Sequence, residues 1–170
     1  MKNVSKVLAV LLALTLSLGM LAGCVGSTRN TARDTAGKYE IALITNKGNI
    51  DDKSFNQGSW EGVQAFATEN NITSKYYKPE EASDAGYLAA IDLAVTGGAK
   101  VIVTPGYLFE VPVYEAQTKY PDVKFILLDG APHTADYATF ETKSNVASVM
   151  YAEEQPGYMA GYAAVKDGYT

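Results

Sequence analysis

The sequence predicts an α/β fold with a parallel, doubly wound sheet. After residue 38, short apolar runs alternate with longer runs whose apolar residues recur at helical spacing. This pattern is typical of strands joined by helices. Small clusters of Gly, Pro, Asn and Asp separate most of these runs, so the connections are short. A parallel sheet connected in this way is covered by helices on both faces.

The first 38 residues precede this pattern. Lys2 and Lys6 stand before the apolar run 7–18, and the segment ends in Leu-Ala-Gly-Cys, with the cysteine at Cys24. This order is typical of a signal peptide, and its end resembles the lipobox of bacterial lipoproteins. The alternatives are an ordinary secretory signal, or a short transmembrane anchor, followed by an incidental cysteine.

The lipobox implies a signal peptide at residues 1–23, lipidation of Cys24, and a tether at residues 24–38. After Cys24 the tether is small and polar without any hydrophobic period, which is typical of a flexible linker. The resemblance therefore implies an extracytoplasmic protein that its lipid anchors to the cell membrane.

The first predicted strand and helix enclose a polar loop. Residues 39–45 form an apolar run that ends in the turn Asn46-Lys47-Gly48, and Ser54 is the expected N-cap of the helix that follows. The helix ends at Asn70-Asn71, and its small and apolar residues recur at helical spacing: Phe55, Gly58, Gly62, Val63, Phe66 and Ala67. Two carboxylates, a hydroxyl, a Phe and an amide occupy the loop and the helix start, which indicates recognition chemistry.

Further strands and helices alternate along the rest of the chain. Strands are expected at residues 73–77, 100–104, 123–128 and, less regularly, 144–151. A helix capped by Ser83 or Asp84 ends at Gly97-Gly98, and its expected core face comprises Tyr87, Leu88, Ile91, Ala94 and Val95. Pro112 restricts the next helix, within residues 109–119, to a start near Val111. The last helix is expected at residues 158–165.

Parallel strands end at one edge of the sheet, so the segments that follow them converge there. These segments are residues 46–56, 79–84, 105–109 and 129–133. They bring polar residues that are far apart in the sequence to one rim.

Composition and motifs exclude several classes of function. With 19 acidic and 14 basic residues, the net charge is −5, which disfavours a nucleic-acid surface. His133 is the only histidine, so a His-based metal cluster is excluded, and no nucleophile elbow accompanies it. Gly-rich phosphate loops are absent from the sequence. We therefore expect no enzyme, no catalytic residue, no cofactor and no metal.

Three motifs in order carry a resemblance to a known family: DDKSFNQGSWEG at 51–62, YPDVKFILLDG at 120–130, and EEQPGYMAGYAA at 153–164. They resemble the N-terminal part of the basic membrane protein family. Its members are lipoproteins that bind purine nucleosides for ABC transporters, with a two-lobed type I periplasmic-binding fold. The resemblance implies an N-terminal lobe at 39–140, and a lobe crossing with the start of the second lobe at 141–170. Most of the second lobe would be missing.

The resemblance also implies roles for site residues. Phe55 would stack on the purine, Asn56 would hydrogen-bond the edge of the base, and Asp129 would accept hydrogen bonds from the ribose hydroxyls. Asp51, Asp52 and Ser54 would line the same wall, and Gly106 and Tyr107 are further candidates. An acidic wall disfavours a phosphorylated ligand.

Other roles remain open for several of these residues. Phe55 could belong to the helix core, one or both of Asp51 and Asp52 could be carboxylates at the helix N-terminus, and Tyr107 could pack within its loop. Glu153 and Glu154 could form an acid and base pair, although polar lining at a lobe crossing is the simpler interpretation.

The resulting functional prediction is a monomeric, lipid-anchored solute-binding protein of an ABC importer. Its partners would be a purine nucleoside, the permease subunits and the membrane, and nucleic acid is not among them. The alternatives are a ligand-sensing surface receptor domain on the same fold, or a nucleoside-processing enzyme. Because the opposing lobe is largely missing, we expect the 170-residue chain alone to bind its ligand weakly or not at all.

Overall fold

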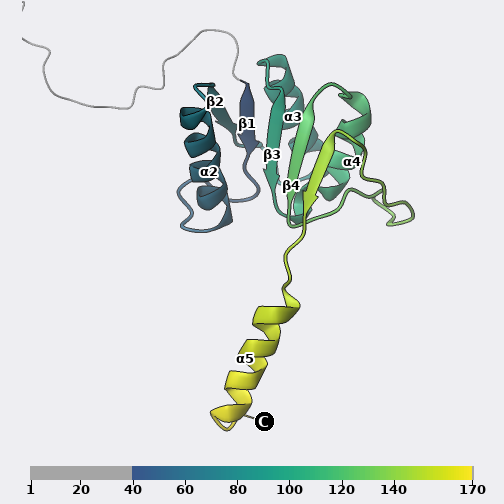
Figure 1. Cartoon of the computed structure of the whole chain (residues 1–170). Coiled ribbons are helices and arrows are strands. Elements are labelled where there is room, and N and C mark those ends of the chain that lie inside the picture. The colour runs from purple at the N-terminus through teal and green to yellow at the C-terminus, as the bar shows by residue number, and fades with distance from the viewer. Residues whose placement is uncertain (1–39, 170) are drawn as a thin grey trace, which may run out of the picture. The chain divides into compact units, whose positions relative to one another are not determined.

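The computed structural model describes residues 40–169. The predicted signal peptide, Cys24 and the tether therefore lie outside the described residues. Within these residues the chain forms one five-stranded sheet with the order β2-β1-β3-β4-β5, and every neighbouring pair is parallel (Figure 1). The strands are β1 (Ile41–Ile44), β2 (Ser74–Tyr77), β3 (Val101–Pro105), β4 (Lys124–Leu128) and β5 (Val146–Val149). The predicted α/β class with a parallel sheet is confirmed.

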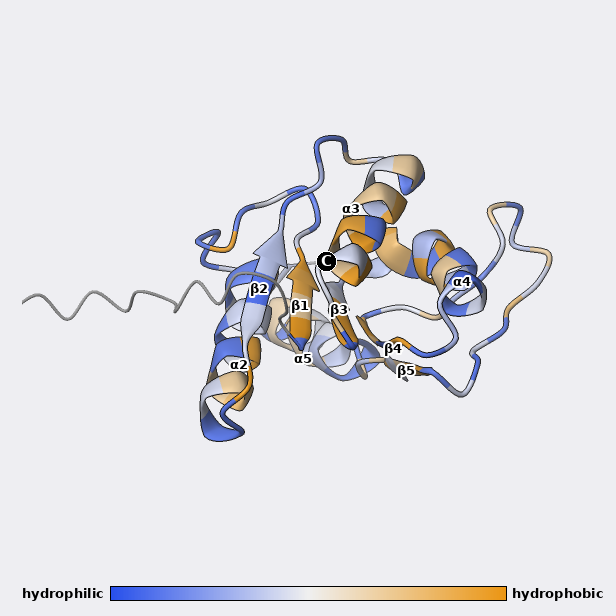
Figure 2. Cartoon of the chain, turned by 90° about the horizontal axis from the view of Figure 1, so that it is seen from above, coloured by the Kyte–Doolittle hydropathy of each residue, from blue (hydrophilic) through white to orange (hydrophobic). Residues whose placement is uncertain are grey.

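Helices lie on both faces of this sheet. One face packs against α2 (Phe55–Glu69), and the other packs against α3 (Asp84–Thr96) and α4 (Glu110–Lys119) (Figures 1 and 2). A short 3-10 turn, η1 (Tyr107–Phe109), leads into α4, and α5 (Glu154–Lys166) follows β5. This two-sided covering is the doubly wound arrangement that the sequence predicts.

The alternation of strand side chains divides the core into two layers. Ile41 and Leu43 pack with Val63 of α2, whereas Ala42 and Ile44 belong to the larger cluster around α3 and α4. All four residues of β1 are buried, because the strand lies between two neighbouring strands and has helices over both faces. This is why the first strand has an uninterrupted apolar sequence.

In the helix α2, only some of the residues at helical spacing are buried. Val63 and Ala67 are buried, but Phe66 is 52% exposed, and Gly58 and Gly62 are also exposed. Phe66 instead lines an apolar cavity over β4 and β5, a part of the sheet that α2 does not cover. Helical spacing therefore identifies the helix but does not by itself show that Phe66 is buried.

The helix α3 follows its prediction closely. Ser83 is its N-cap, and its Oγ accepts a hydrogen bond of 3.1 Å from the backbone N–H of Gly86. Tyr87, Ile91 and Ala94 are buried on the expected face. The next helix, α4, begins at Glu110, and this start places Pro112 in the first turn, where a missing N–H costs nothing.

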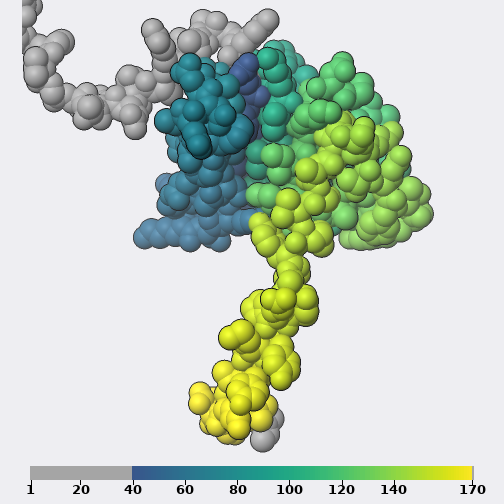
Figure 3. All heavy atoms as spheres, in the orientation of Figure 1, coloured from purple at the N-terminus to yellow at the C-terminus, as the bar shows by residue number. Residues whose placement is uncertain are grey.

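Of the two C-terminal elements, β5 lies where it was predicted and α5 begins earlier than predicted. The strand β5 lies within the predicted β-prone run 144–151 and pairs with β4 from Val146 to Val149, so it extends the same sheet. The lobe boundary at residue 140 stays a prediction. The helix α5 starts at Glu154 instead of residue 158, with Pro156 in its first turn. Every described residue of α5 is exposed (Figure 3).

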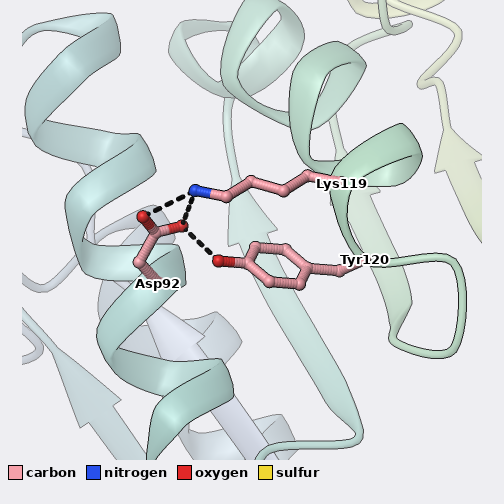
Figure 4. Close-up of polar contacts among 3 residues, drawn as sticks. All are labelled: Asp92, Lys119 and Tyr120. Carbon is pink, nitrogen blue, oxygen red and sulfur yellow. Dashed lines mark hydrogen bonds and ion pairs between the residues drawn. The ribbon is translucent and has the colours of Figure 1, made fainter.

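A polar cluster joins the two helices on one face (Figure 4). Asp92 of α3 accepts hydrogen bonds from the Lys119 ammonium at 2.8 Å and from the Tyr120 hydroxyl at 2.7 Å. Partial burial raises the pKa of the Asp92 carboxyl, but the hydrogen bonds from Lys119 and Tyr120 and the charge of Lys119 more than offset this, so its pKa lies below the ordinary value of 3.8. The cluster therefore stabilises the packing of α3 against α4.

We expect Asp92→Asn to lower the Tm by about 2 °C near neutral pH, because the pair is largely solvated. Because the pKa of Asp92 is lower in the folded state, its ionised carboxylate stabilises the fold fully at pH values above the ordinary pKa. This stabilisation is lost as the pH falls through the lowered pKa of the folded state. The Tm difference between wild type and Asp92→Asn should therefore disappear in acid. Thermal unfolding of both proteins and of Lys119→Gln, alone and combined, measures this coupling; additive effects would contradict it.

Candidate functional site

The connections that follow β1 and β3 lead to opposite faces of the sheet, which makes this pair of strands the topological switch point of the fold. These two strands are neighbours in the sheet, but β1 leads into α2 on one face, whereas β3 leads through η1 into α4 on the other. Loops that diverge in this way leave a crevice beyond the ends of the strands, where open α/β folds bind ligands. We call this edge of the sheet the carboxyl edge.

The loop after β1 is held by a network of side-chain amides. Asn56 donates hydrogen bonds from Nδ2 to Asn46 Oδ1 and Asp52 Oδ2, each at 2.8 Å, and its Oδ1 accepts one from the backbone N–H of Asn46 at 3.0 Å. Asn46 Nδ2 also donates to the carbonyl of Pro105 at the end of β3. The network therefore fastens the start of α2 to the ends of both β1 and β3.

Asn56 is almost completely buried, with 1% of its surface exposed. Both hydrogens of its amide and the amide oxygen have partners within the loop, so in the structure its role is to shape the loop. Direct contact of Asn56 with a ligand stays a prediction.

The side chain that caps α2 is Asp52, although Ser54 is the N-cap residue. Asp52 Oδ1 accepts hydrogen bonds from the backbone N–H groups of Ser54 and Gln57, at 2.9 and 3.1 Å, whereas the Ser54 side chain forms no capping hydrogen bond. Desolvation raises the pKa of Asp52, but hydrogen bonds from Gln57, Asn56 and Ser54 outweigh it, and the pKa lies below its ordinary value. Ser54 therefore occupies the N-cap position as predicted, but the path of the loop places the Asp52 carboxylate over the free N–H groups, so Asp52 supplies the capping hydrogen bonds.

Phe55 lies at the switch point between β1 and β3. A Cβ added to Gly106 would lie 4.0 Å from Cε1 of the Phe55 ring and 3.4 Å from Nδ2 of Asn46. The Phe55 ring is half-buried, and the ring of Tyr151 meets it edge-on with a centroid distance of 6.2 Å. Three loops, those after β1, β3 and β5, thus meet at Phe55.

Gly106 and Asp129 end neighbouring strands. The paired register of β3 and β4 runs to Pro105 and Leu128, and Gly106 donates a 2.7 Å hydrogen bond to the carbonyl of Leu128. Gly106 has a φ of 108°, a conformation that glycine adopts without strain. Among the described residues, the Asp129 carboxylate accepts no hydrogen bond from protein, so it is available to a ligand.

The structure separates two other predicted residues from this group. Asp51 is exposed and lines a cavity of about 350 Å³ beside β2, together with Thr45 and Lys78. Tyr107 is 65% exposed and lines a cavity of about 230 Å³ with Glu110 and His133. Phe55, Gly106 and Asp129 therefore form the core of the candidate site, with Asp51 and Tyr107 at its sides.

Sequence reasoning missed the roles of Asn46 and Tyr151. Asn46 is the hub of the loop network, and its signal is a polar amide directly after a buried strand. Tyr151 gives no such signal, because its contact with Phe55 depends on β5 joining the sheet.

Other kinds of site find no support in residues 40–169. No group of three His, Cys, Asp or Glu side chains in this part of the chain is placed to hold a metal ion. Its helices are also too short or too polar to cross a membrane. A cavity of about 620 Å³ lies on the sheet face beside α2, but its lining is mainly apolar. It lacks the convergent polar groups that a sugar or nucleobase requires.

Comparison with known proteins identifies the family. Residues 39–167 match the family described as ABC transporter substrate-binding protein PnrA-like. A Lactococcus lactis protein named ABC transporter nucleoside-binding protein BmpA is 30% identical over 173 residues, which cover 97% of this chain and 45% of the relative. A protein of Pyrococcus abyssi named as an uncharacterized lipoprotein is 27% identical and is covered over 35% of its length.

A solved structure agrees with these relatives. A crystal structure of ABC transporter system solute-binding proteins from Aeropyrum pernix superposes with a TM-score of 0.61 at 26% identity, over 72% of this chain and 31% of that one. The chain spans less than half the length of the relatives and of this solved structure. The match over residues 39–167 shows that this chain belongs to the family of PnrA-like ABC transporter substrate-binding proteins.

Proposed function

We propose that this chain provides one wall of a purine-nucleoside site in the solute-binding lipoprotein of an ABC importer. The observation that carries the proposal is the placement of the Phe55 ring at the switch point, next to Gly106 and with the free Asp129 carboxylate on the neighbouring strand. The name of the Lactococcus lactis relative supports a nucleoside as the ligand.

The purine would stack on the Phe55 ring. A flat base gains from contact with an aromatic face, and the Asn46, Asn56 and Asp52 network fixes the backbone from which the ring projects. The edge contact from Tyr151 limits rotation of the ring. Such a pre-organised ring loses little entropy on binding.

The ribose would bind at Asp129. Two adjacent hydroxyls can both donate to one carboxylate, and hydrogen bonds to a charged acceptor are stronger than neutral ones. Asp51 and Ser54 would line the wall from their exposed positions, and Asn56 and Asp52 would act chiefly by holding the loop. Gly106 would let the ligand approach the backbone, with Tyr107 at the margin of the site.

The second wall would come from the part of the protein that the longer relatives have and this chain does not contain. Closure of two lobes around the ligand would give the tight state, so residues 25–170 alone would bind in the millimolar range. No covalent chemistry is part of the proposal. The lipid on Cys24 would keep a monomeric binding protein near its permease, on the outer side of the cell membrane.

An NMR titration of ¹⁵N-labelled residues 25–170 tests the proposal. With inosine, we expect saturable shifts of the backbone amides of Phe55, Gly106 and Gly130. Inosine 5′-monophosphate should bind more weakly, because the negative charge of its phosphate is repelled by the carboxylates of the wall. Ribose alone serves as a control for the contribution of the base. Shifts that spare these amides at saturating inosine would contradict the proposal.

A further inference from the structure

Asp129 occupies a backbone conformation that needs support. Its φ is 62°, in the left-handed region that residues other than glycine seldom adopt. Asp and Asn enter this region more readily than other side chains, but the surrounding structure must still hold them there. What holds Asp129 therefore decides where its carboxylate points.

The turn is fastened on its two sides by different elements. On one side, the backbone N–H of Asp129 donates a 2.8 Å hydrogen bond to the carbonyl of Val149, at the end of β5. On the other side, the backbone N–H of Ala131 donates to Oε1 of Glu110 at 2.9 Å. Glu110 stands in the first turn of α4, where the helix dipole favours a carboxylate.

The second carboxylate oxygen of Glu110 contacts His133. Glu110 Oε2 lies 3.2 Å from Nε2 of His133, and Nδ1 of His133 lies 2.8 Å from the carbonyl of Thr134. Both neighbours of the ring are oxygen acceptors, so the imidazole links the Glu110 carboxylate to the loop at Thr134.

This pair is shielded from water. The His133 side chain is 3% exposed and that of Glu110 is 20% exposed. The ring of Tyr137 stacks on His133 at 4.1 Å between centroids, and Phe140 packs beside it at 4.9 Å. Shielded hydrogen bonds to a charged group hold their geometry better than exposed ones.

Gly130 lets the loop approach Glu110 closely. A Cβ added to Gly130 would lie 2.8 Å from Cγ of Glu110 and 3.1 Å from its Oε1. Any side chain at this position would push the Glu110 carboxylate away from Ala131. The two residues that follow Asp129 are thus packed against, or hydrogen-bonded to, one carboxylate.

We propose that Glu110, together with His133, is a positioning pair that fixes the Asp129 turn and thereby sets affinity for the ribose of the ligand. The affinity part of this inference rests on the proposed function. The positioning part does not, because it concerns the turn in the free protein. Glu110 itself faces the cavity that it shares with Tyr107 and His133 and acts through Asp129.

The first test uses the protein without ligand. Glu110→Ala leaves the N–H of Ala131 without its acceptor, so we expect amide hydrogen exchange of Ala131 to speed up about tenfold. The ¹⁵N relaxation of residues 129–134 should show added motion. Glu110→Gln retains an acceptor oxygen and should restore most of the protection. Glu115→Gln on the exposed side of the same helix is the matched control and should change nothing.

The second test compares two ligands. In Glu110→Ala, the affinity for inosine should fall about fivefold, whereas the affinity for 2′,3′-dideoxyinosine, which lacks the diol, should stay within twofold. Unchanged exchange at Ala131 would overturn the positioning role. Faster exchange with unchanged inosine affinity would overturn the link to ribose. Failure of the wild type to bind inosine would reject the proposed function and leave the exchange result to decide the positioning role.

Discussion

Phe55→Ala is expected to lower the association constant for inosine about 50-fold, which takes binding by residues 25–170 out of the range of a titration. The substitution removes the aromatic face on which the base would stack, and such stacking contributes about 1–3 kcal/mol per base. The loop network does not involve the Phe55 ring, so the fold of the site should persist. Amide shifts followed during titration should therefore show no saturation at inosine concentrations that saturate the wild type.

Phe66→Ala is the matched control for this prediction. It is the same substitution on the same helix, at a ring that is 52% exposed and lines the apolar cavity over β4 and β5. Inosine affinity should stay within twofold of the wild type. If Phe55→Ala binds as well as Phe66→Ala does, the base does not stack on Phe55.

Asp129→Asn is expected to lower inosine affinity about tenfold, because a neutral amide replaces the charged acceptor of two hydrogen bonds. Asn has nearly the same shape and also tolerates a left-handed backbone, so the turn at φ 62° should be retained. The affinity for 2′,3′-dideoxyinosine should not change, since that ligand has no diol to donate. Titration of both proteins with both ligands measures the loss that is specific to the ribose hydroxyls.

Asp122→Asn provides the comparison for a lost surface charge. Asp122 is exposed and lies in the turn before β4. It should leave both affinities unchanged. Equal losses for inosine and dideoxyinosine in Asp129→Asn would mean that Asp129 affects binding without contacting the diol.

Most of the fold could be predicted because buried strands and helix faces have recognisable apolar patterns in the sequence. The strands β1, β3 and β4 are apolar runs, since helices or neighbouring strands surround them. Hydrophobic spacing also placed α3 correctly. The same spacing does not show that Phe66 is exposed, because periodicity identifies an apolar stripe but not how much of the sheet a helix covers.

The details of the loop after β1 could not be predicted in the same way. Three residues, Asp51, Asp52 and Ser54, are all chemically suited to cap α2, and only the path of the chain selects Asp52. Asn56 is a polar residue in a buried position, which a hydrophobic pattern cannot show. It is buried because partners from the same loop satisfy its amide.

Some residues of the candidate site could be predicted from the sequence, and others could not. Residues at strand ends, such as Gly106 and Asp129, follow from the rule that parallel strands end at one edge. The support behind Asp129 does not follow from any local pattern. Glu110 comes from a helix start and His133 from a distant loop, and only the packed structure brings them together.

The central claim is that a purine nucleoside lies with its base on Phe55 and its ribose at Asp129. Intermolecular nuclear Overhauser effects between inosine and ¹³C,¹⁵N-labelled residues 25–170 test it most directly. We predict contacts from the purine H2 and H8 protons to the Phe55 ring, and from the ribose protons to the backbone of Asp129 and Gly130. Contacts from inosine to the apolar cavity beside α2, with none to Phe55, would contradict the account.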